Sequence, residues 1–218
     1  MGYNIAIDGP AGAGKSTIAK LAAKKLGYVY VDTGAMYRAL AIHFLDAGIA
    51  ADDKEAIAGA CESAEVTIKY LDSVQHVYLN GVDVTSRIRE EAVGNMASKS
   101  SSIPEVRAKL LELQRTLARE EDVIMDGRDI GTNILPEADL KIYLTASTKT
   151  RADRRYKELT EKNIECDYDE IYKDIEERDK RDMEREIAPL KQAEDAVLID
   201  SSDMGIEEVV SEIIRLNK

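Results

Sequence analysis

The feature that most constrains the fold is a glycine-rich segment near the N-terminus. Residues 9–16, GPAGAGKS, match the pattern G-x-x-x-x-G-K-[ST] without departure. Its glycines permit a tight turn in which successive backbone N–H groups point inward at phosphate oxygens. An apolar run over Tyr3–Asp8 precedes it and a helical pattern over Lys15–Leu26 follows. We therefore expect a phosphate-binding loop between a buried strand and a helix whose positive dipole end attracts anions.

This loop predicts a nucleoside triphosphate and Mg²⁺ as ligands. Lys15 can reach the β- and γ-phosphates, and the hydroxyl of Ser16 can ligate the metal ion. We expect ATP as the triphosphate and Ser16 as the metal ligand. The predicted ATP-binding residues are Gly9, Pro10, Ala11, Gly12, Ala13, Gly14, Lys15, Ser16 and Thr17.

Short apolar runs alternate with helical patterns along most of the chain, which is typical of βαβ units and a parallel sheet. Gly27 and Gly48 are placed to end the first two helices, the second of which is expected over Ala35–Asp46. We expect an α/β fold with five parallel strands flanked by helices. The predicted strands are Tyr3–Asp8, Tyr28–Asp32, Val123–Asp126, Leu140–Leu144 and Ala196–Asp200.

Two stretches interrupt this alternation. In Glu65–Val84, apolar and polar residues alternate, and Asn80-Gly81 is a hairpin turn signal, so we expect a small antiparallel insert there. Thr85 is expected to cap a following helix. Arg151–Leu190 is rich in both charge signs and reads as two helices joined near Asn163–Asp167.

Composition excludes several classes of protein. The chain has 218 residues, of which 44% are hydrophobic, enough for one folded domain with a sizeable core. The net charge of −12 argues against broad binding to nucleic acid or to an anionic membrane. No signal peptide or membrane-spanning run is visible, and Cys61 and Cys166 are expected to be free thiols. We expect a cytoplasmic monomer.

A small kinase fits best among proteins with such a loop. No Asn-Lys-x-Asp motif for guanine recognition is present, which argues against a GTPase. A kinase must hold two mutually repelling phosphates face to face, so it needs several arginines around the transferred group. Candidates follow the second and third strands and lie on the two charged helices: Arg38, Arg128, Arg151, Arg154, Arg155, Arg178 and Arg185. The spacing of Arg178, Asp182 and Arg185 would place them on one helical face, although a solvated salt-bridge face has the same spacing.

No general base is expected, because a nucleoside monophosphate is largely a dianion at neutral pH and can attack as it stands. His43 and His76 are accordingly interpreted as structural or surface residues.

Three further motifs carry a family resemblance. They are residues 32–38, DTGAMYR; residues 127–132, GRDIGT; and residues 178–190, which begin RDKRD and end APL. With the phosphate loop, their order and spacing resemble bacterial cytidylate kinases over nearly the whole chain. The resemblance implies ATP-dependent, in-line phosphorylation of CMP and dCMP to CDP and dCDP, in pyrimidine metabolism. Some relatives have serine where this chain has Thr33, which keeps the hydroxyl.

The resemblance also implies roles for individual residues. Arg38, Arg128 and Arg185 would bind the acceptor phosphate, and Asp182 the sugar hydroxyls. Ser98, Arg107 and Asp129 would read cytosine, with Thr33 lining the pocket. The implied catalytic set is Lys15, Arg128, Arg154, Arg155, Arg178 and Arg185. The implied division of the single kinase domain is a core of residues 1–60, 89–150 and 169–218, a monophosphate-binding β insert of residues 61–88, and a helical lid of residues 151–168.

Two alternatives stay open at this point. The acceptor could be another monophosphate such as UMP, or a small metabolite such as shikimate. The chain could also be a nucleotide-binding regulator without catalysis, which the presence of Lys15, Ser16 and the arginines disfavours.

Overall fold

The computed structural model describes residues 2–72 and 74–217, and its chain divides into two compact units. The first, here called the β-insert unit, comprises Val29–Val123 with the N-terminal residues up to Tyr3. The second, the phosphate-loop unit, comprises Asn4–Tyr28 and the chain from Ile124 onward. These units are defined by contacts between residues, not by function. The predicted limits of the core, the insert and the lid therefore stay a prediction. Within the described ranges, no helix is long and apolar enough to cross a membrane.

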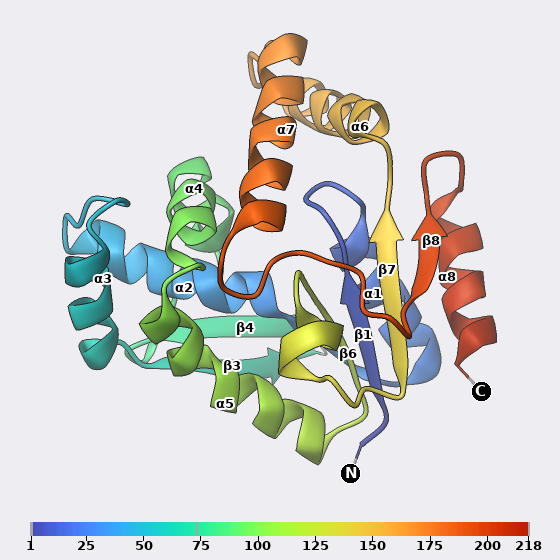
Figure 1. The fold of residues 1–218 in the computed structure, drawn as a ribbon, viewed down its shortest axis with the longest axis horizontal. Helices are drawn as coiled ribbons and strands as arrows, with labels where there is room; N and C mark the ends of the chain where they lie inside the picture. The colour runs from blue at the N-terminus through green and yellow to red at the C-terminus, as the bar shows by residue number, and fades with distance from the viewer. Residues whose placement is uncertain (1, 73, 218) are drawn as a thin grey trace. The chain divides into compact units, whose positions relative to one another are not determined.

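Five strands of the described chain form one sheet in the order β2-β6-β1-β7-β8. Figure 1 labels four of them, β1, β6, β7 and β8. Strand β1 pairs in parallel with β7, with Ile5 opposite Leu140, and β7 pairs in parallel with β8. Ile5, Ala6 and Ile7 of β1 are fully buried, as expected for an apolar strand at the centre of such a sheet. The predicted α/β architecture is therefore confirmed. The strands are β1 Asn4–Asp8, β2 Val29–Asp32, β6 Val123–Gly127, β7 Leu140–Thr145 and β8 Val197–Asp200.

The helices of the phosphate-loop unit form two packed pairs, α1 with α8 and α6 with α7 (Figure 1). Helix α1 has the predicted bounds and ends at Gly27, whose left-handed φ of 76° allows its N–H to bond the carbonyl of Ala23. The predicted pair of charged helices joined near 163–167 is also confirmed. The helices are α1 Lys15–Leu26, α6 Thr148–Glu161, α7 Tyr168–Glu184 and α8 Ile206–Leu216, with a π-helical segment η3 at Ile130–Ile134.

The β-insert unit contains the predicted antiparallel sheet, in which β4 pairs with both β3 and β5. Asn80 and Gly81 have φ values of 49° and 80°, the positive values required by the tight turn that their sequence predicts. Helix α2 packs against β4, α4 and α5. The elements are α2 Thr33–Asp46, α3 Lys54–Ala60, η1 Cys61–Ser63, β3 Val66–Leu71, β4 Val74–Leu79, β5 Val82–Asp83, η2 Arg87–Arg89, α4 Glu91–Ser100 and α5 Pro104–Glu120.

One prediction at a helix end was wrong. Thr85 caps no helix: its hydroxyl accepts a hydrogen bond from Val77 N at 2.9 Å, which braces the antiparallel insert instead. Arg185 is the C-cap residue of α7: its N–H donates to the carbonyl oxygen of Arg181 at 3.2 Å, and its φ of −61° is helical. Its side chain therefore leaves from the helical face of Arg178 and Asp182, as the spacing predicts, although its ψ of 140° takes the following chain out of the helix.

Candidate active site

The phosphate loop follows β1 directly and depends on glycine at its two ends. A Cβ on Gly9 would collide with the carbonyl oxygen of Leu144 on the neighbouring strand β7. Gly14 stands before α1 with a left-handed φ of 89°, which costs other residues conformational energy. Among the described residues, no side chain caps the start of α1, so its first N–H groups are available to an anion.

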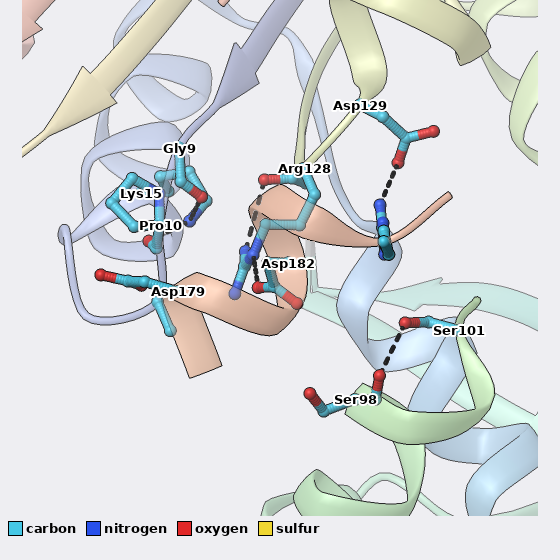
Figure 2. Close-up of polar contacts among 12 residues, drawn as sticks. Gly9, Pro10, Lys15, Ser98, Ser101, Arg128, Asp129, Asp179 and Asp182 are labelled. Carbon is cyan, nitrogen blue, oxygen red and sulfur yellow. Dashed lines mark hydrogen bonds and ion pairs between the residues drawn. The ribbon is translucent and has the colours of Figure 1, made fainter. Parts of the chain in front are cut away.

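Lys15, the first residue of α1, is held inside this loop. Its ammonium donates 2.8 Å hydrogen bonds to the carbonyl oxygens of Gly9 and Pro10, and its side chain is buried (Figure 2). Burial, together with the nearby charge of Arg128, lowers the pKa of Lys15 to about 7. Phosphate oxygens would supply the negative charge that favours its charged form, so the site is suited to a polyanion.

Ser16, the predicted metal ligand, contacts a carboxylate beside the loop. The hydroxyl of Ser16 donates a 3.0 Å hydrogen bond to Oδ2 of Asp126, a buried carboxylate near the end of β6. With its proton engaged, the hydroxyl keeps a lone pair for a hard cation. Among the described residues, no group of three His, Cys, Asp or Glu side chains could hold a metal ion alone. This donor set fits Mg²⁺, which commonly takes few protein ligands and completes its shell with water and phosphate oxygens.

Three of the predicted arginines converge on one carboxylate. Asp182 on α7 is buried, and its Oδ2 accepts a 2.8 Å hydrogen bond from Nε of Arg128 (Figure 2). Burial by itself would raise the pKa of Asp182, but the guanidinium groups of Arg128, Arg178 and Arg185 outweigh it and hold that pKa below its usual value. The phosphate-loop unit thus brings these three arginines near one carboxylate, and their roles toward a substrate stay predictions.

Asp129 and Arg185 form a second buried pair in the same unit. Nη2 of Arg185 lies 3.4 Å from Oδ1 of Asp129, and both side chains are nearly inaccessible to solvent. Asn133 donates a 3.1 Å hydrogen bond to the other carboxylate oxygen of Asp129. Nε of Arg185 donates to the carbonyl oxygen of Ala188 at 2.6 Å. The guanidinium and the carboxylate are therefore held in fixed positions by neighbouring groups.

The two predicted arginines of α6 have different surroundings. Arg154 donates a 2.7 Å hydrogen bond to the carbonyl oxygen of Ser201, and its Nη1 lies 3.9 Å from the place of a Cβ on Gly14. It therefore stands beside the phosphate loop. Arg155 is exposed and pairs with Glu158 of its own helix at 3.0 Å. Of these two arginines, Arg154 is the one with a contact beside the loop among the described residues.

Arg151, a third candidate arginine on α6, also holds the loop. The guanidinium of Arg151 is 4% exposed and donates to the carbonyl oxygen of Ala11 in the loop at 3.1 Å. It forms a two-pronged ion pair with Asp179 on α7, the shorter contact being 2.5 Å. The stem of Arg151 also lies 3.3 Å from the place of a Cβ on Gly12. The sequence names Arg151 as a candidate arginine and places Asp179 in the RDKRD motif, but it does not indicate that these two side chains pair.

In the β-insert unit, α2 begins at the end of β2 and carries two predicted residues. Asp32 caps it by accepting from Ala35 N at 2.9 Å, so the helix starts at Thr33 and not at Ala35. Thr33 is buried at this start. Nη1 of Arg38 lies 3.3 Å from the place of a Cβ on Gly34, so the guanidinium folds back toward the first turn of the helix.

Ser98 and Arg107 lie on α4 and α5, which both pack against α2. The hydroxyl oxygen of Ser98 is buried, and among the described residues it has no hydrogen-bond partner. The guanidinium of Arg107 donates to the carbonyl oxygen of Ser101 at 3.3 Å and lies 5.9 Å from the centre of the Tyr37 ring. A buried hydroxyl without a partner is unfavourable unless a ligand or water satisfies it.

The histidines and cysteines have the expected structural surroundings. Nε2 of His43 lies 3.2 Å from the carbonyl oxygen of Ala60, and His76 pairs with Asp83 at 2.9 Å. Cys61 and Cys166 are free thiols.

The chain is similar to proteins of one family over nearly its whole length. A family model described as cytidylate kinase matches residues 5–218. A protein named cytidylate kinase from Caldicellulosiruptor saccharolyticus is 52% identical over 213 residues, covering 98% of this chain and 94% of that protein. Another protein of this name, from Carboxydothermus hydrogenoformans, is 47% identical over 212 residues, covering 97% of this chain and 96% of the relative.

Solved structures of other kinases share the fold. A gluconokinase from Sinorhizobium meliloti has a TM-score of 0.51 at 15% identity, covering 98% of this chain and 93% of that one. Shikimate kinase from Bacteroides thetaiotaomicron has a TM-score of 0.50 at 15% identity, covering 99% and 98%. At such identity the likeness shows the fold alone. The match to the family model and the identity of the relatives show that this chain belongs to the cytidylate kinase family and is a nucleoside monophosphate kinase.

Proposed function

We propose that the protein transfers the γ-phosphoryl group of ATP to CMP and dCMP, giving ADP with CDP or dCDP. The observation that supports this most strongly is the set of cationic groups in the phosphate-loop unit. Lys15 lies inside the loop, and Arg128, Arg178 and Arg185 approach Asp182. Such a set of cations suits two phosphate chains that repel each other.

Lys15 and the inward-facing amides of the loop would bind the β- and γ-phosphates of ATP. Ser16, oriented by Asp126, would hold Mg²⁺, which neutralises charge on the triphosphate when it is bound. The arginines would stabilise the charge that spreads over the transferred group and orient the attacking oxygen of the monophosphate. Among them, Arg154 is supported by its place beside the loop, whereas Arg155 would first have to leave Glu158.

Recognition of cytosine is proposed for Asp129, Ser98 and Arg107, with Thr33 lining the base pocket. A carboxylate can accept from the N4 amino group of cytosine, and an arginine can donate to N3 and O2. The buried, unpartnered hydroxyl of Ser98 supports a ligand contact there. Arg38, Arg128 and Arg185 are proposed for the acceptor phosphate, and Asp182 for the sugar hydroxyls. That the enzyme is a cytoplasmic monomer stays a prediction from composition.

UMP is the alternative acceptor. Uracil has an acceptor where cytosine has the N4 donor, so a carboxylate at this place would repel it. A buried mismatch of this kind typically costs on the order of 10²-fold or more in kcat/KM. The carboxylate of Asp129 is held by Asn133 and Arg185, so it cannot readily turn away from a mismatched base.

A coupled assay of ADP release with ATP and Mg²⁺ tests the proposal, using CMP, dCMP, UMP and AMP as acceptors. CMP and dCMP should have the highest kcat/KM. Turnover of AMP or UMP far above that of CMP would overturn the base assignment. Lys15→Met should lower kcat by orders of magnitude, because the loop loses its ammonium. The control Lys25→Met, at an exposed position paired with Glu207, should keep wild-type activity. A protein that shows no turnover to lose would instead be a nucleotide-binding regulator.

A further inference from the structure

Asp8, the last residue of β1, links the phosphate loop to the segment after β6. It stands directly before Gly9, and its side chain is 5% exposed. Its Oδ1 accepts a hydrogen bond from Ile130 N at 2.7 Å, and its Oδ2 accepts one from Gly131 N at 2.8 Å. One carboxylate thus holds two consecutive N–H groups at the start of the π-helical segment η3.

A carboxylate is the side chain that suits this position. The first N–H groups of a helical turn have no partner within the helix, and here they are buried. An ionised carboxylate offers an acceptor oxygen to each of the two N–H groups. An asparagine has one acceptor oxygen, and its NH₂ group would face the second N–H donor. A substitution of Asp8 by asparagine therefore removes one of the two hydrogen bonds to the segment while keeping the size of the side chain.

The tethered segment begins immediately after Asp129. The backbone angles of Asp129, φ −146° and ψ 32°, belong to neither a regular strand nor a helix, so the direction of its side chain depends on what holds the next residues. Ile130 is fully buried. A Cβ on Gly131 would lie 3.1 Å from the side chain of Lys141 and 3.5 Å from Asp8 itself. The segment is therefore packed directly against Lys141 and Asp8, and the hydrogen bonds from its two N–H groups to Asp8 set its position.

We propose that Asp8 is a positioning residue for base selection: by holding the N–H groups of Ile130 and Gly131, it fixes the place where Asp129 presents its carboxylate to the base. This inference rests on the proposed function, in which Asp129 distinguishes cytosine from uracil. In this role Asp8 would act without contacting the base or the phosphates, because both of its oxygens are engaged by Ile130 N and Gly131 N. Its effect on selectivity passes through the backbone of the segment.

The readout is the ratio of kcat/KM for CMP to kcat/KM for UMP at one ATP and Mg²⁺ concentration. Asp8 also lies near Lys15, and its charge raises the pKa of that residue. An effect on ATP binding is common to both acceptors and cancels in the ratio, whereas a misplaced Asp129 changes the ratio. Asp8→Asn and Asp8→Ser should each lower it by about tenfold, the effect of losing one buried hydrogen bond. The control Ile213→Ala in α8, a core truncation far along the chain from η3, should lower the melting temperature and leave the ratio unchanged.

Asp129→Ala and the double variant Asp8→Asn/Asp129→Ala complete the experiment. If Asp8 acts through Asp129, the double variant has the same ratio as Asp129→Ala alone, since coupled residues are not additive. A folded Asp8→Asn with the wild-type ratio overturns the inference and leaves the proposed function intact, provided that Asp129→Ala lowers the ratio. An unchanged ratio in Asp129→Ala overturns the proposed role of Asp129 in cytosine recognition. It then also overturns the proposed role of Asp8, which acts through Asp129. If neither Asp8 variant folds, by far-ultraviolet circular dichroism, Asp8 serves the stability of the fold and the inference is overturned.

Discussion

Arg128 and Asp182, which lie 54 residues apart in the chain, form an ion pair with 2.8 Å between Nε and Oδ2 (Figure 2). The pair keeps the guanidinium neutralised and oriented before any phosphate arrives. Preorganisation of this kind lowers the cost of arranging charges during catalysis. It also makes Asp182 important to the stability of the protein, because three arginines face it.

Asp182→Asn should destabilise the protein and impair turnover of CMP. Removing one partner of a buried ion pair typically costs about 3–5 kcal/mol, and we expect the lower end because Arg128 keeps some contact with solvent. Urea unfolding measures the change in the free energy of unfolding. Glu207→Gln removes the exposed partner of Lys25 and should change it by less than about 0.5 kcal/mol. Equal losses in the two variants would contradict a special role for the buried pair.

Arg151→Lys should loosen the phosphate loop although the positive charge is kept. The ammonium of lysine cannot reproduce the planar guanidinium, whose two terminal nitrogens contact both carboxylate oxygens of Asp179 and the carbonyl oxygen of Ala11. We expect a lower melting temperature and a KM for ATP raised by about tenfold, with a smaller effect on the KM for CMP. Arg215→Lys is the matched control, because that arginine forms an exposed pair with Glu212. A wild-type KM for ATP in Arg151→Lys would show that the loop does not depend on this contact.

Ser16→Ala should raise the Mg²⁺ concentration needed for half-maximal activity, by about 10–100-fold, which is typical when a group that supports a metal site is lost. Ser16→Thr should stay close to wild type, since the motif accepts either hydroxyl. The measurement is activity against Mg²⁺ concentration at fixed ATP, with EDTA to define zero activity. An alanine variant with an unchanged Mg²⁺ requirement would exclude Ser16 as a metal ligand.

Asp8 should make the free energy of unfolding depend on pH. Burial is the main cause that raises the pKa of Asp8 from 3.8 to about 6. The hydrogen bonds from Ile130 N and Gly131 N, and the charge of Lys15, lower that pKa, whereas the charge of Asp129 raises it. Between these two pKa values the folded state binds the proton that the unfolded state has released, so stability falls as pH rises from about 4 to about 6. Above pH 6 this contribution is lost, a change of about 3 kcal/mol for two pKa units.

The comparison of wild type with Asp8→Asn isolates this effect. The free energy of unfolding of the wild type, minus that of the variant, should decrease from pH 4 to pH 6 and then level off. Urea unfolding at half-unit pH steps over that range provides the measurement. Titration of Lys15, whose pKa is about 7, lies mostly above the window. A difference that is constant or increases with pH would show that the carboxyl of Asp8 is not the group responsible.

Much of the fold could be predicted from local sequence patterns. Glycine at positions 9 and 14, the helical periodicity of Lys15–Leu26, and Asn80-Gly81 act through sterics and hydrogen bonds among residues near in sequence, and each of these predictions was confirmed. The family resemblance named the arginines, and the structure gathers Arg128, Arg178 and Arg185 around Asp182. The roles of Thr33, Arg38, Ser98 and Arg107 toward CMP stay predictions.

The tertiary structure alone decided which charges meet. Asp8 holds residues 122 and 123 positions away, and Arg151 pairs with a carboxylate on the next helix, contacts that no local spacing announces. Arg185 keeps the helical face that its spacing predicted, but only the folded chain brings that face to Asp129, 56 residues away. Helices, strands and turns form through interactions between residues that are close in sequence. Buried ion pairs depend instead on how the strand order brings distant segments together. Only in the folded interior do these charged groups lose water and need a partner.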